Sequence, residues 1–298
     1  MSKEAIRESG QYLDQVPINM PQMCLHGLSE NWLFKYLGAK HWDMLSGGLK
    51  TTSSQLQNQD GQRLYASFVR IRMESNHSLF SFQENDSLAL RAQMQRYGND
   101  MYFSNCELRS KQDASNVIHA QLMTVFSIRE SENNQKLLRS QSSAEASEIP
   151  AAGKMPALGM EYRKIKMNKL HNLQLGGLDF ELNDAVVHER EYILNPYYDV
   201  NGVGLIYFAA YPAINDFCES QYFNQQHPDG RWEADYSSAA RDILYYANCD
   251  PSDVIVYRLN QVEQLDNGLV KTVSSLSRKS DGALMARLFT IKKPRNKS

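Results

Sequence analysis

Cysteine and concentrated charge are both scarce in this sequence of 298 residues. The four cysteines, Cys24, Cys106, Cys218 and Cys249, lie far apart and form no C-x-x-C pair, so their spacing predicts neither a zinc site nor a disulfide framework. The formal net charge is -2, with both signs mixed along the chain. This mixture argues against nucleic acid as the main partner, because phosphate binding requires concentrated Lys and Arg.

Long apolar runs are missing as well. Residues 1–15 lack the apolar segment of a secretory leader, and no later stretch is apolar for long enough to span a bilayer. Together with the unpaired cysteines, this indicates a protein of the reducing cytoplasm that has no membrane partner. We also expect no bound metal.

The length of the chain suits two domains of ordinary size. Residues 131–159 are rich in Ser, Ala, Glu and Gln, contain Pro150 and Pro156, and show no apolar periodicity. Such a composition is typical of a linker. The sequence therefore predicts an N-terminal domain over 1–130, a linker over 131–159 and a C-terminal domain over 160–298.

One structural plan occurs twice in the sequence. Residues 23–45 read MCLHGLSENWLFKYLGAKHWDML, an apolar lead-in and a His26-Gly27 turn before a largely apolar helix, for which Ser29 is the expected N-cap. Residues 198–221 read YDVNGVGLIYFAAYPAINDFCESQ, in which an Asn-Gly-Val-Gly turn precedes an aromatic-rich helix from about Leu205. Apolar residues cover more than one face of the first helix, which is typical of a helix surrounded by protein.

Strands follow the first of these helices and lie on both sides of the second. The first half has strand-like runs over 63–73, 87–97, 100–110 and 116–130, and the second half has them over 185–194, 242–248, 254–265, 268–279 and 283–293. Consecutive strands joined by short turns predict a mainly antiparallel sheet. A helix buried by such a sheet, repeated in tandem, is an α+β architecture.

A long helix that follows a glycine turn and is wrapped by an antiparallel sheet resembles the hot-dog fold of acyl-thioester enzymes. The segment DVNGVGLIYFAAY resembles the substrate-binding turn of hot-dog thioesterases, and two units would make a double hot-dog. The first half narrows the resemblance. MPQMCLHGLSENWLFKYLGAKHW, followed by GQRLYASF, resembles the leinamycin-pathway acyltransferase/decarboxylase family of polyketide biosynthesis.

This resemblance implies an activity and a catalytic residue. Members of the family decarboxylate methylmalonyl-CoA and pass the propionyl group to the phosphopantetheine arm of an acyl carrier protein. The implied partners are therefore an acyl-CoA substrate and an acyl carrier protein, with no cofactor bound to the enzyme. The catalytic residue of the family is a tyrosine, which Tyr65 in GQRLYASF matches by motif position. From the residues alone, Tyr65 would be an ordinary strand aromatic, as most of the 16 tyrosines must be.

Thioester chemistry requires hydrogen-bond donors at the carbonyl oxygen, which a helix N-terminus supplies. The substrate-positioning candidates at the first helix start are His26, Gly27, Leu28, Ser29 and Asn31. Those at the second helix start are Asn201, Gly202, Val203 and Gly204. We expect the first start, beside Tyr65, to be the working one. The structural alternatives are that His26 caps a helix and that the asparagines fix turns.

Several features leave alternatives open. Asp216 and Glu219, one helical turn apart, could present carboxylates as in some hot-dog thioesterases or form a solvated face. The basic stretch over 163–169 could attract an acidic carrier protein or CoA phosphates, or simply be solvated. His41 and His119 are expected to be satisfied core residues.

The alternative functions are a hot-dog thioesterase or dehydratase acting on carrier-bound chains, and a non-catalytic module that binds acyl-CoA or a carrier protein. The lack of an H-x-x-x-G-x-x-x-x-P signature counts against the dehydratase. A homodimer is left open.

Overall fold

The computed structural model describes residues 6–8, 11–130, 134–135, 137–143, 147–226 and 230–295. The chain forms two compact units, one of Met1–Ile128 with Arg139–Glu161 and one of Arg129–Leu138 with Tyr162–Ser298. These limits differ from the predicted domains, because most of the expected linker packs on the first unit. Ile149 is buried in its core, and Arg96 exchanges backbone hydrogen bonds with Pro150 and Ala152.

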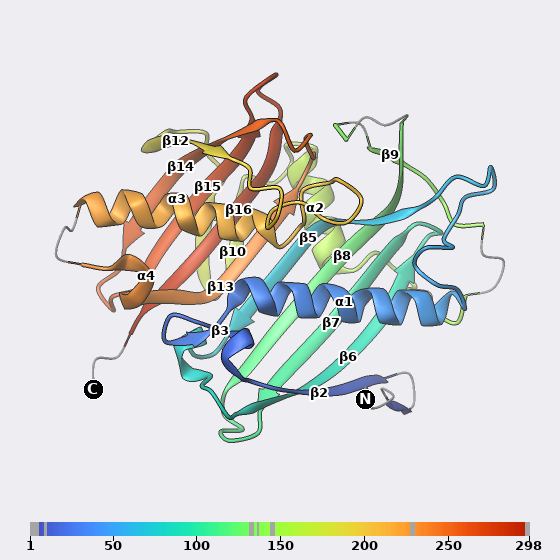
Figure 1. Ribbon diagram of the computed structural model, residues 1–298, viewed down its shortest axis with the longest axis horizontal. Coiled ribbons are helices and arrows are strands. Elements are labelled where there is room, and N and C mark those ends of the chain that lie inside the picture. The colour runs from blue at the N-terminus through green and yellow to red at the C-terminus, as the bar shows by residue number, and fades with distance from the viewer. Residues whose placement is uncertain are drawn as a thin grey trace. The chain divides into compact units, whose positions relative to one another are not determined.

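The first unit combines one long helix, α1 (Glu30–Gly48), with an antiparallel sheet (Figure 1). The strands of this sheet lie in the order β1 (Ile6–Glu8), β2 (Gln11–Pro17), β6 (Ser87–Tyr97), β7 (Met101–Ser110), β8 (Val117–Arg129) and β5 (Tyr65–Ser75). The short elements are η1 (Met20–Gln22), β3 (Met23–Cys24), β4 (Gly27–Leu28), η2 (Leu79–Ser81) and β9 (Leu137–Arg139).

The second unit repeats this plan with α3 (Ala210–Gln226). Its strands lie in the order β12 (His188–Ile193), β14 (Val254–Gln264), β15 (Val270–Arg278), β16 (Leu284–Pro294) and β13 (Tyr236–Tyr245). The remaining elements are α2 (Ala157–Lys166), β10 (Asn172–Leu175), β11 (Leu178–Glu181) and α4 (Trp232–Asp235).

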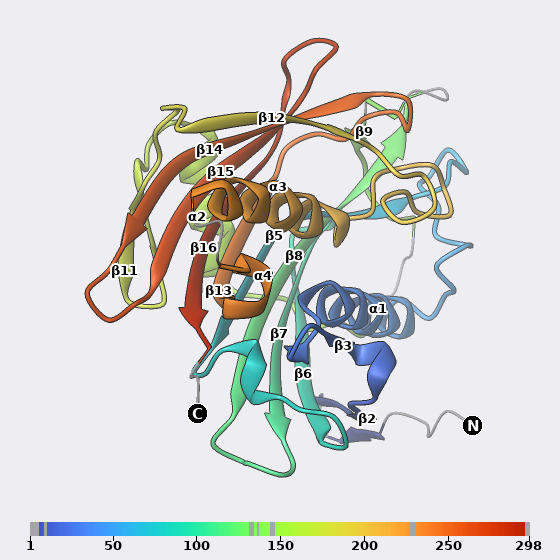
Figure 2. The same ribbon diagram turned by 60° about the vertical axis from the view of Figure 1, so that its left-hand side comes forward.

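The two units have the same topology. Five strands of each unit share one plan, in which one strand precedes the helix and four follow it, and the strand orders β2-β6-β7-β8-β5 and β12-β14-β15-β16-β13 correspond strand for strand. Figure 2 shows each long helix lying along one face of its own sheet. The predicted α+β double hot-dog architecture is therefore confirmed. Among the residues that the structure describes, no helix has the length and apolarity needed to cross a membrane.

The sequence predicts that helix α1 is buried on most sides. In the structure, its fully buried residues form one stripe. The buried residues follow a spacing of three and four: Leu33, Phe34, Leu37, Gly38, His41, Met44, Leu45 and Gly48. On the other side, Ala39 and Asp43 are exposed. Trp32 and Tyr36 lie outside the stripe, are half-buried and stack on each other with ring centroids 5.2 Å apart, so α1 is surrounded less completely than expected.

The start of α1 has the expected cap and an unexpected turn. Ser29 Oγ accepts a hydrogen bond from the Trp32 backbone N–H at 3.3 Å, which confirms Ser29 as the N-cap. The left-handed residue of the turn is His26, with φ of 69°, and not Gly27. Gly27 is required for close approach, because a Cβ there would lie 2.6 Å from the Leu79 carbonyl oxygen.

Helix α3 begins at Ala210, five residues later than predicted. The preceding segment is tied down by other bonds. The Ile206 N–H donates to Asn248 Oδ1 at 2.9 Å, and the Tyr207 N–H donates to the Asp199 carbonyl at 2.7 Å. As a result Pro212 falls in the first helical turn, where its missing N–H breaks no helical hydrogen bond.

His41 is the polar residue at the centre of the first core. It is fully buried, and its two ring nitrogens lie 2.7 Å from Ser104 Oγ and 2.8 Å from Thr124 Oγ1. Burial lowers the pKa of His41 to about 3. The prediction of a satisfied core histidine is confirmed for His41. It is wrong for His119, which is exposed because side chains alternate along β8 and the buried Ile118 and Ala120 flank it.

The stability of the protein should depend on pH through His41. The unfolded chain binds a proton below its pKa of about 6.5, whereas the folded state does so only near the depressed value. Stability is therefore fully present above pH 6.5 and is lost as the pH falls toward 3. Between pH 7.5 and 5.5, His41 should account for about 1.4 kcal/mol of lost unfolding free energy.

Urea unfolding at these two pH values, on the wild type and on His41→Gln, measures this contribution. The Gln amide keeps a donor and an acceptor for Ser104 and Thr124 but cannot titrate, so the pH difference should shrink by about 1.4 kcal/mol. His119→Gln, an exposed histidine on β8, should behave as the wild type. An unchanged pH difference in His41→Gln would show that the buried imidazole protonates without cost.

Candidate functional site

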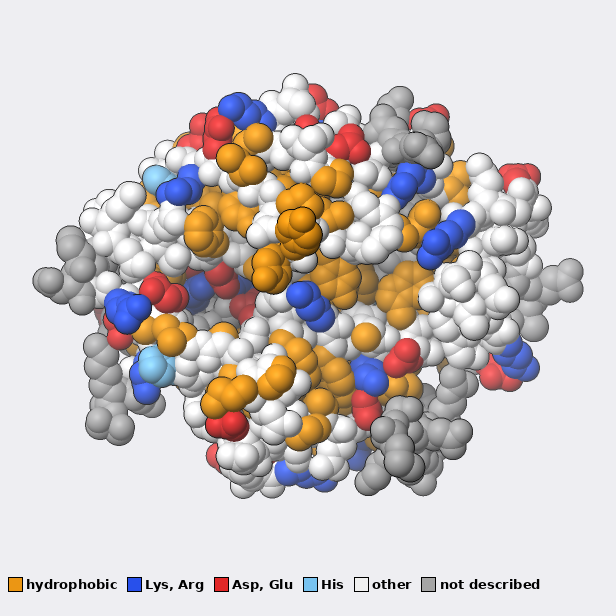
Figure 3. Space-filling model, in the orientation of Figure 1, with side chains coloured by type: hydrophobic (Ala, Val, Ile, Leu, Met, Phe, Trp, Pro, Cys, Tyr) orange, Lys and Arg blue, Asp and Glu red, His pale blue; other side chains and the backbone are white. Residues whose placement is uncertain are grey.

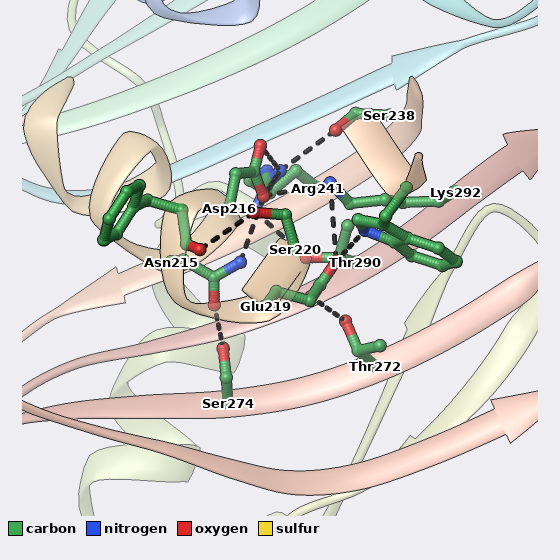
Figure 4. Close-up of polar contacts among 12 residues, drawn as sticks. Asn215, Asp216, Glu219, Ser220, Ser238, Arg241, Thr272, Ser274, Thr290 and Lys292 are labelled. Carbon is green, nitrogen blue, oxygen red and sulfur yellow. Dashed lines mark hydrogen bonds and ion pairs between the residues drawn. The ribbon is translucent and has the colours of Figure 1, made fainter. Parts of the chain in front are cut away.

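A polar cluster lies between α3 and the sheet of the second unit (Figure 4). It is built on Asn215, Asp216 and Glu219 of α3, of which Asn215 and Glu219 are fully buried and the Asp216 side chain is 33% exposed. A solvated helix face, one of the two alternatives for the carboxylate pair, is therefore wrong for Glu219. The reason is its place in the sheet-facing stripe of α3, beside the buried Cys218.

Two cations from the sheet meet these carboxylates. Arg241 of β13 places Nη2 at 2.8 and 2.9 Å from the two carboxylate oxygens of Asp216. Lys292 of β16 places Nζ at 3.1 Å from Asp216 Oδ1 and 3.4 Å from Glu219 Oε1. The Arg241 side chain is fully buried and that of Lys292 is 6% exposed. Two positive and two negative side chains thus balance in a largely buried site, as buried charges require.

Neutral side chains complete the hydrogen bonding. Both oxygens of Glu219 accept, one from Thr272 Oγ1 at 3.0 Å and one from Trp232 Nε1 at 3.3 Å. Arg241 also donates to Thr290 Oγ1 at 3.2 Å and to Ser238 Oγ at 3.0 Å. The guanidinium and the buried carboxylate are therefore held from α3, α4 and three strands.

The charges decide what the cluster can do. Burial by itself would raise the pKa of Asp216, but the Arg241 guanidinium and the Lys292 ammonium outweigh it and hold this pKa well below its usual range. Asp216 is therefore ionised and a weak base at neutral pH. Figure 3 shows acidic and basic side chains together in a hollow between α3 and α4, so solvent reaches the rim of this charged site.

The first helix start is occupied by structural hydrogen bonds. The Ser29 N–H donates to the Gln22 carbonyl at 2.9 Å, and the Ser29 hydroxyl caps the helix. His26 is exposed, and its carbonyl accepts from Gln83 Nε2 at 3.1 Å. Gly27 and Leu28 are buried, and Asn31 is half-buried. Ser29, and not His26, is therefore the cap of α1, and the Gln22 and Gln83 contacts fix the turn before it.

Tyr65 lies far from this helix start, so the expectation that the two are neighbours is wrong. Tyr65 is the first residue of β5, whereas Gly27 packs against Leu79 and Phe80, which follow the other end of β5. A strand of 11 residues spans roughly 35 Å. The sequence could not show this separation. The His26 turn and the start of β5 are near each other along the chain, but they lie at opposite ends of α1.

Arg63 is the charged neighbour of Tyr65. Its guanidinium carbon lies 5.3 Å from the centroid of the tyrosine ring, and Tyr65 is half-buried. The second arginine near it in sequence, Arg70, is fully buried and donates to the Leu158 carbonyl at 2.9 Å and to Glu161 at 3.0 Å.

The Asn201 turn of the second unit is also closed by its own hydrogen bonds. Asn201 Oδ1 accepts from the N–H groups of Val203 at 3.0 Å and Leu205 at 3.1 Å. Gly204, with φ of 81°, accepts through its carbonyl from Asn134 Nδ2 at 2.8 Å. Because α3 begins only at Ala210, the placement of Asn201, Gly202, Val203 and Gly204 at a helix N-terminus is wrong.

Arg241 and Lys292 were not recognised from the sequence, although an internal repeat marks the first of them. Strand β5 begins Tyr65-Ala-Ser67-Phe-Val-Arg70, and β13 begins Tyr236-Ser-Ser238-Ala-Ala-Arg241. Both strands share the spacing Tyr-x-Ser-x-x-Arg, and both arginines are fully buried. An arginine on a strand among buried apolar residues requires an anionic partner, and this requirement points to the carboxylates of α3.

No protein-family model and no curated protein matches the sequence. Among solved structures, a 12:0-ACP thioesterase from Umbellularia californica superposes with a TM-score of 0.63 at 12% identity, over 96% of this chain and 94% of that one. The chain has a double hot-dog fold. An oleoyl thioesterase from Lactobacillus plantarum gives a TM-score of 0.67 at 10% identity, over 95% and 96%. An acyl-ACP thioesterase from Bacteroides thetaiotaomicron gives 0.60 at 10% identity, over 95% and 98%. At these identities the similarity concerns the fold of the double hot-dog.

Loss of one partner of the Arg241–Asp216 ion pair should lower the unfolding free energy strongly, whereas replacement of both partners by apolar residues should lower it much less. Arg241→Met leaves the Asp216 carboxylate without its bidentate partner, so we expect a loss of about 3–5 kcal/mol in unfolding free energy. The double variant Arg241→Met/Asp216→Leu should recover most of this loss, because it removes both charges. Urea unfolding of the two single variants and the double variant gives the coupling energy.

Arg258→Met is the matched control. Arg258 pairs with Glu189 at 2.6 Å, but both side chains are at least a third exposed, so its loss should cost less than about 1 kcal/mol. If the losses of the Arg241 and Asp216 single variants simply add in the double variant, the two charges are not coupled.

Proposed function

We propose that this protein acts on acyl thioesters and transfers a propionyl group, formed by decarboxylation of methylmalonyl-CoA, to the phosphopantetheine thiol of an acyl carrier protein. The double hot-dog fold, shared with structures named as thioesterases, supports an acyl thioester as the substrate. The resemblance of residues 20–42 and 61–68 to the acyltransferase/decarboxylase family supports the decarboxylative transfer.

The ion pairs and hydrogen bonds that occupy the α3 carboxylates are the observation that favours transfer over hydrolysis. A base that activates water works best when its pKa lies near the operating pH. Asp216 is instead held as an ion pair by Arg241 and Lys292, and both oxygens of Glu219 accept hydrogen bonds. Neither carboxylate is suited to activate water, whereas decarboxylation and thiol exchange need no such base.

The proposed reaction has two balanced steps. In the first, the bond between the α-carbon and the carboxylate breaks, carbon dioxide leaves, and the electron pair enters the thioester enolate, whose α-carbon then takes a proton from water. In the second, the carrier thiol sulfur bonds to the carbonyl carbon, and the CoA sulfur leaves with the proton of that thiol. No oxidant or reductant is consumed.

Tyr65 is the residue we assign to this chemistry. Its phenol can donate to the thioester oxygen while charge gathers there, or it can carry the acyl group between CoA and the carrier. The Arg63 guanidinium over the ring favours negative charge at either stage. An acyl adduct on the tryptic peptide that contains Tyr65 would distinguish the two roles.

Hydrolysis is the second candidate function, because the structures with which the chain shares its fold are named thioesterases. One assay separates the two reactions. The protein is incubated with methylmalonyl-CoA and a phosphopantetheinylated carrier protein, and the carrier is weighed intact. We expect a propionyl increment on the carrier. Free acid with an unmodified carrier would establish hydrolysis, and the absence of turnover would overturn both.

Tyr65→Phe should lower the rate of transfer by on the order of 100-fold or more while the protein stays folded. Tyr236→Phe is the matched control. Tyr236 occupies the same position of the repeated spacing, is half-buried like Tyr65, and stacks on Trp232 with centroids 4.2 Å apart. It should retain transfer within about twofold. Full activity of Tyr65→Phe, or equal losses in both variants, would remove Tyr65 from the mechanism.

A further inference from the structure

The chain carries one stretch of concentrated positive charge that the proposed chemistry does not use. Between Tyr162 and Leu178 the sequence has no Asp or Glu but contains four cationic residues, Arg163, Lys164, Lys166 and Lys169. The first three occupy the last turn of α2, and all four side chains are exposed. We call these four residues the α2 basic surface.

The fold directs these side chains outward. Tyr162 and Ile165 of α2 are buried, and the Tyr162 hydroxyl donates to the Tyr245 carbonyl at 3.1 Å, which anchors one side of the helix in the second unit. The intervening Arg163 and Lys164 must then face away from this anchor. The side chain of Met167, which lies among the cations in sequence, is 49% exposed.

Many other cations among the described residues are paired with carboxylates. Lys40, Lys271 and Lys279 each lie within 2.8 Å of a carboxylate oxygen. Among the described residues, no carboxylate lies within ion-pair distance of the four side chains of the α2 basic surface. The acidic residue that precedes them in sequence, Glu161, is instead bound at 3.0 Å by Arg70 and Arg72. The surface thus retains its full positive charge.

We propose that the α2 basic surface is the docking surface for an acidic acyl carrier protein. This inference rests on the proposed function, which names such a protein as the acyl acceptor. A patch of one sign on a chain of net charge -2 attracts an acidic partner and raises its association rate. The exposed thioether of Met167, which lies between Lys166 and Lys169 in sequence, adds an adaptable apolar contact.

The layout of the patch favours a protein over the phosphates of CoA. A phosphate site is compact and combines charge with converging donors, such as a bidentate arginine or backbone N–H groups. The four cations instead come from the last turn of α2 and the segment directly after it, and all four are exposed. Exposed charge beside an exposed apolar side chain matches the mixed surface of a protein interface.

Neutral variants test the docking surface. The docking set is Arg163→Gln, Lys164→Gln, Lys166→Gln and Lys169→Gln in one chain. The control set is Arg91→Gln, Lys111→Gln, Lys154→Gln and Arg295→Gln, four exposed cations elsewhere with the same total charge change. Association with a fluorescent, phosphopantetheinylated acyl carrier protein is followed by stopped flow at several salt concentrations. Propionyl transfer is measured separately with free pantetheine as the acceptor.

The docking set should lower the association rate for the carrier protein about tenfold at low salt and flatten its salt dependence. The control set should keep both within about twofold, and transfer to pantetheine should be unchanged in either set. Equal losses in both sets, or a raised KM for methylmalonyl-CoA in the docking set, would overturn the proposal. The association rate is measured without turnover. A failure of the proposed reaction would therefore appear in the transfer to pantetheine and not in the association rate. Thermal melting of both sets reports any change in the stability of α2.

Discussion

The second unit depends on the neutralisation of a guanidinium that its sheet holds away from water. Arg241 is fully buried, and α3 must present Asp216 at hydrogen-bond distance for this burial to be tolerated. The pair fixes the rotation of α3 about its axis, which in turn directs Asn215 and Glu219 at the sheet. The polar cluster and the packing of α4 through Trp232 follow from that one orientation.

The two halves share a topology but place different chemistry under their helices. In the first unit, the centre of the helix stripe is a neutral imidazole, His41, bonded to Thr124 of β8. In the second unit, Thr290 of β16, which lies at the corresponding place in A-x-L-x-T, bonds instead to Arg241. The same backbone plan therefore places a neutral side chain under α1 and charged side chains under α3, beside the hollow of Figure 3.

The sequence predicts the architecture well, because periodicity and turn residues are local. The strand over 87–97 and the buried His41 follow directly from it. Prediction from the sequence fails where the function of a residue depends on packing between distant segments. The gap between Tyr65 and the His26 turn arises from the length of β5, and the late start of α3 arises from bonds to Asn248. The charged cluster was not predicted, because Arg241 and Glu219 each resemble surface residues until α3 is packed on its sheet.

The route of the chain between the units limits which fragments contain a complete core, and it affects folding during synthesis. The polypeptide leaves the first unit after Ile128, returns to it at Arg139 and leaves again after Glu161. A single cut therefore cannot separate the halves, and a fragment that ends at residue 130 lacks Ile149 of the first core. During synthesis from the N-terminus, the first unit lacks part of its core until more than half of the chain has been made, so its α1 sheet face stays incompletely covered for that time.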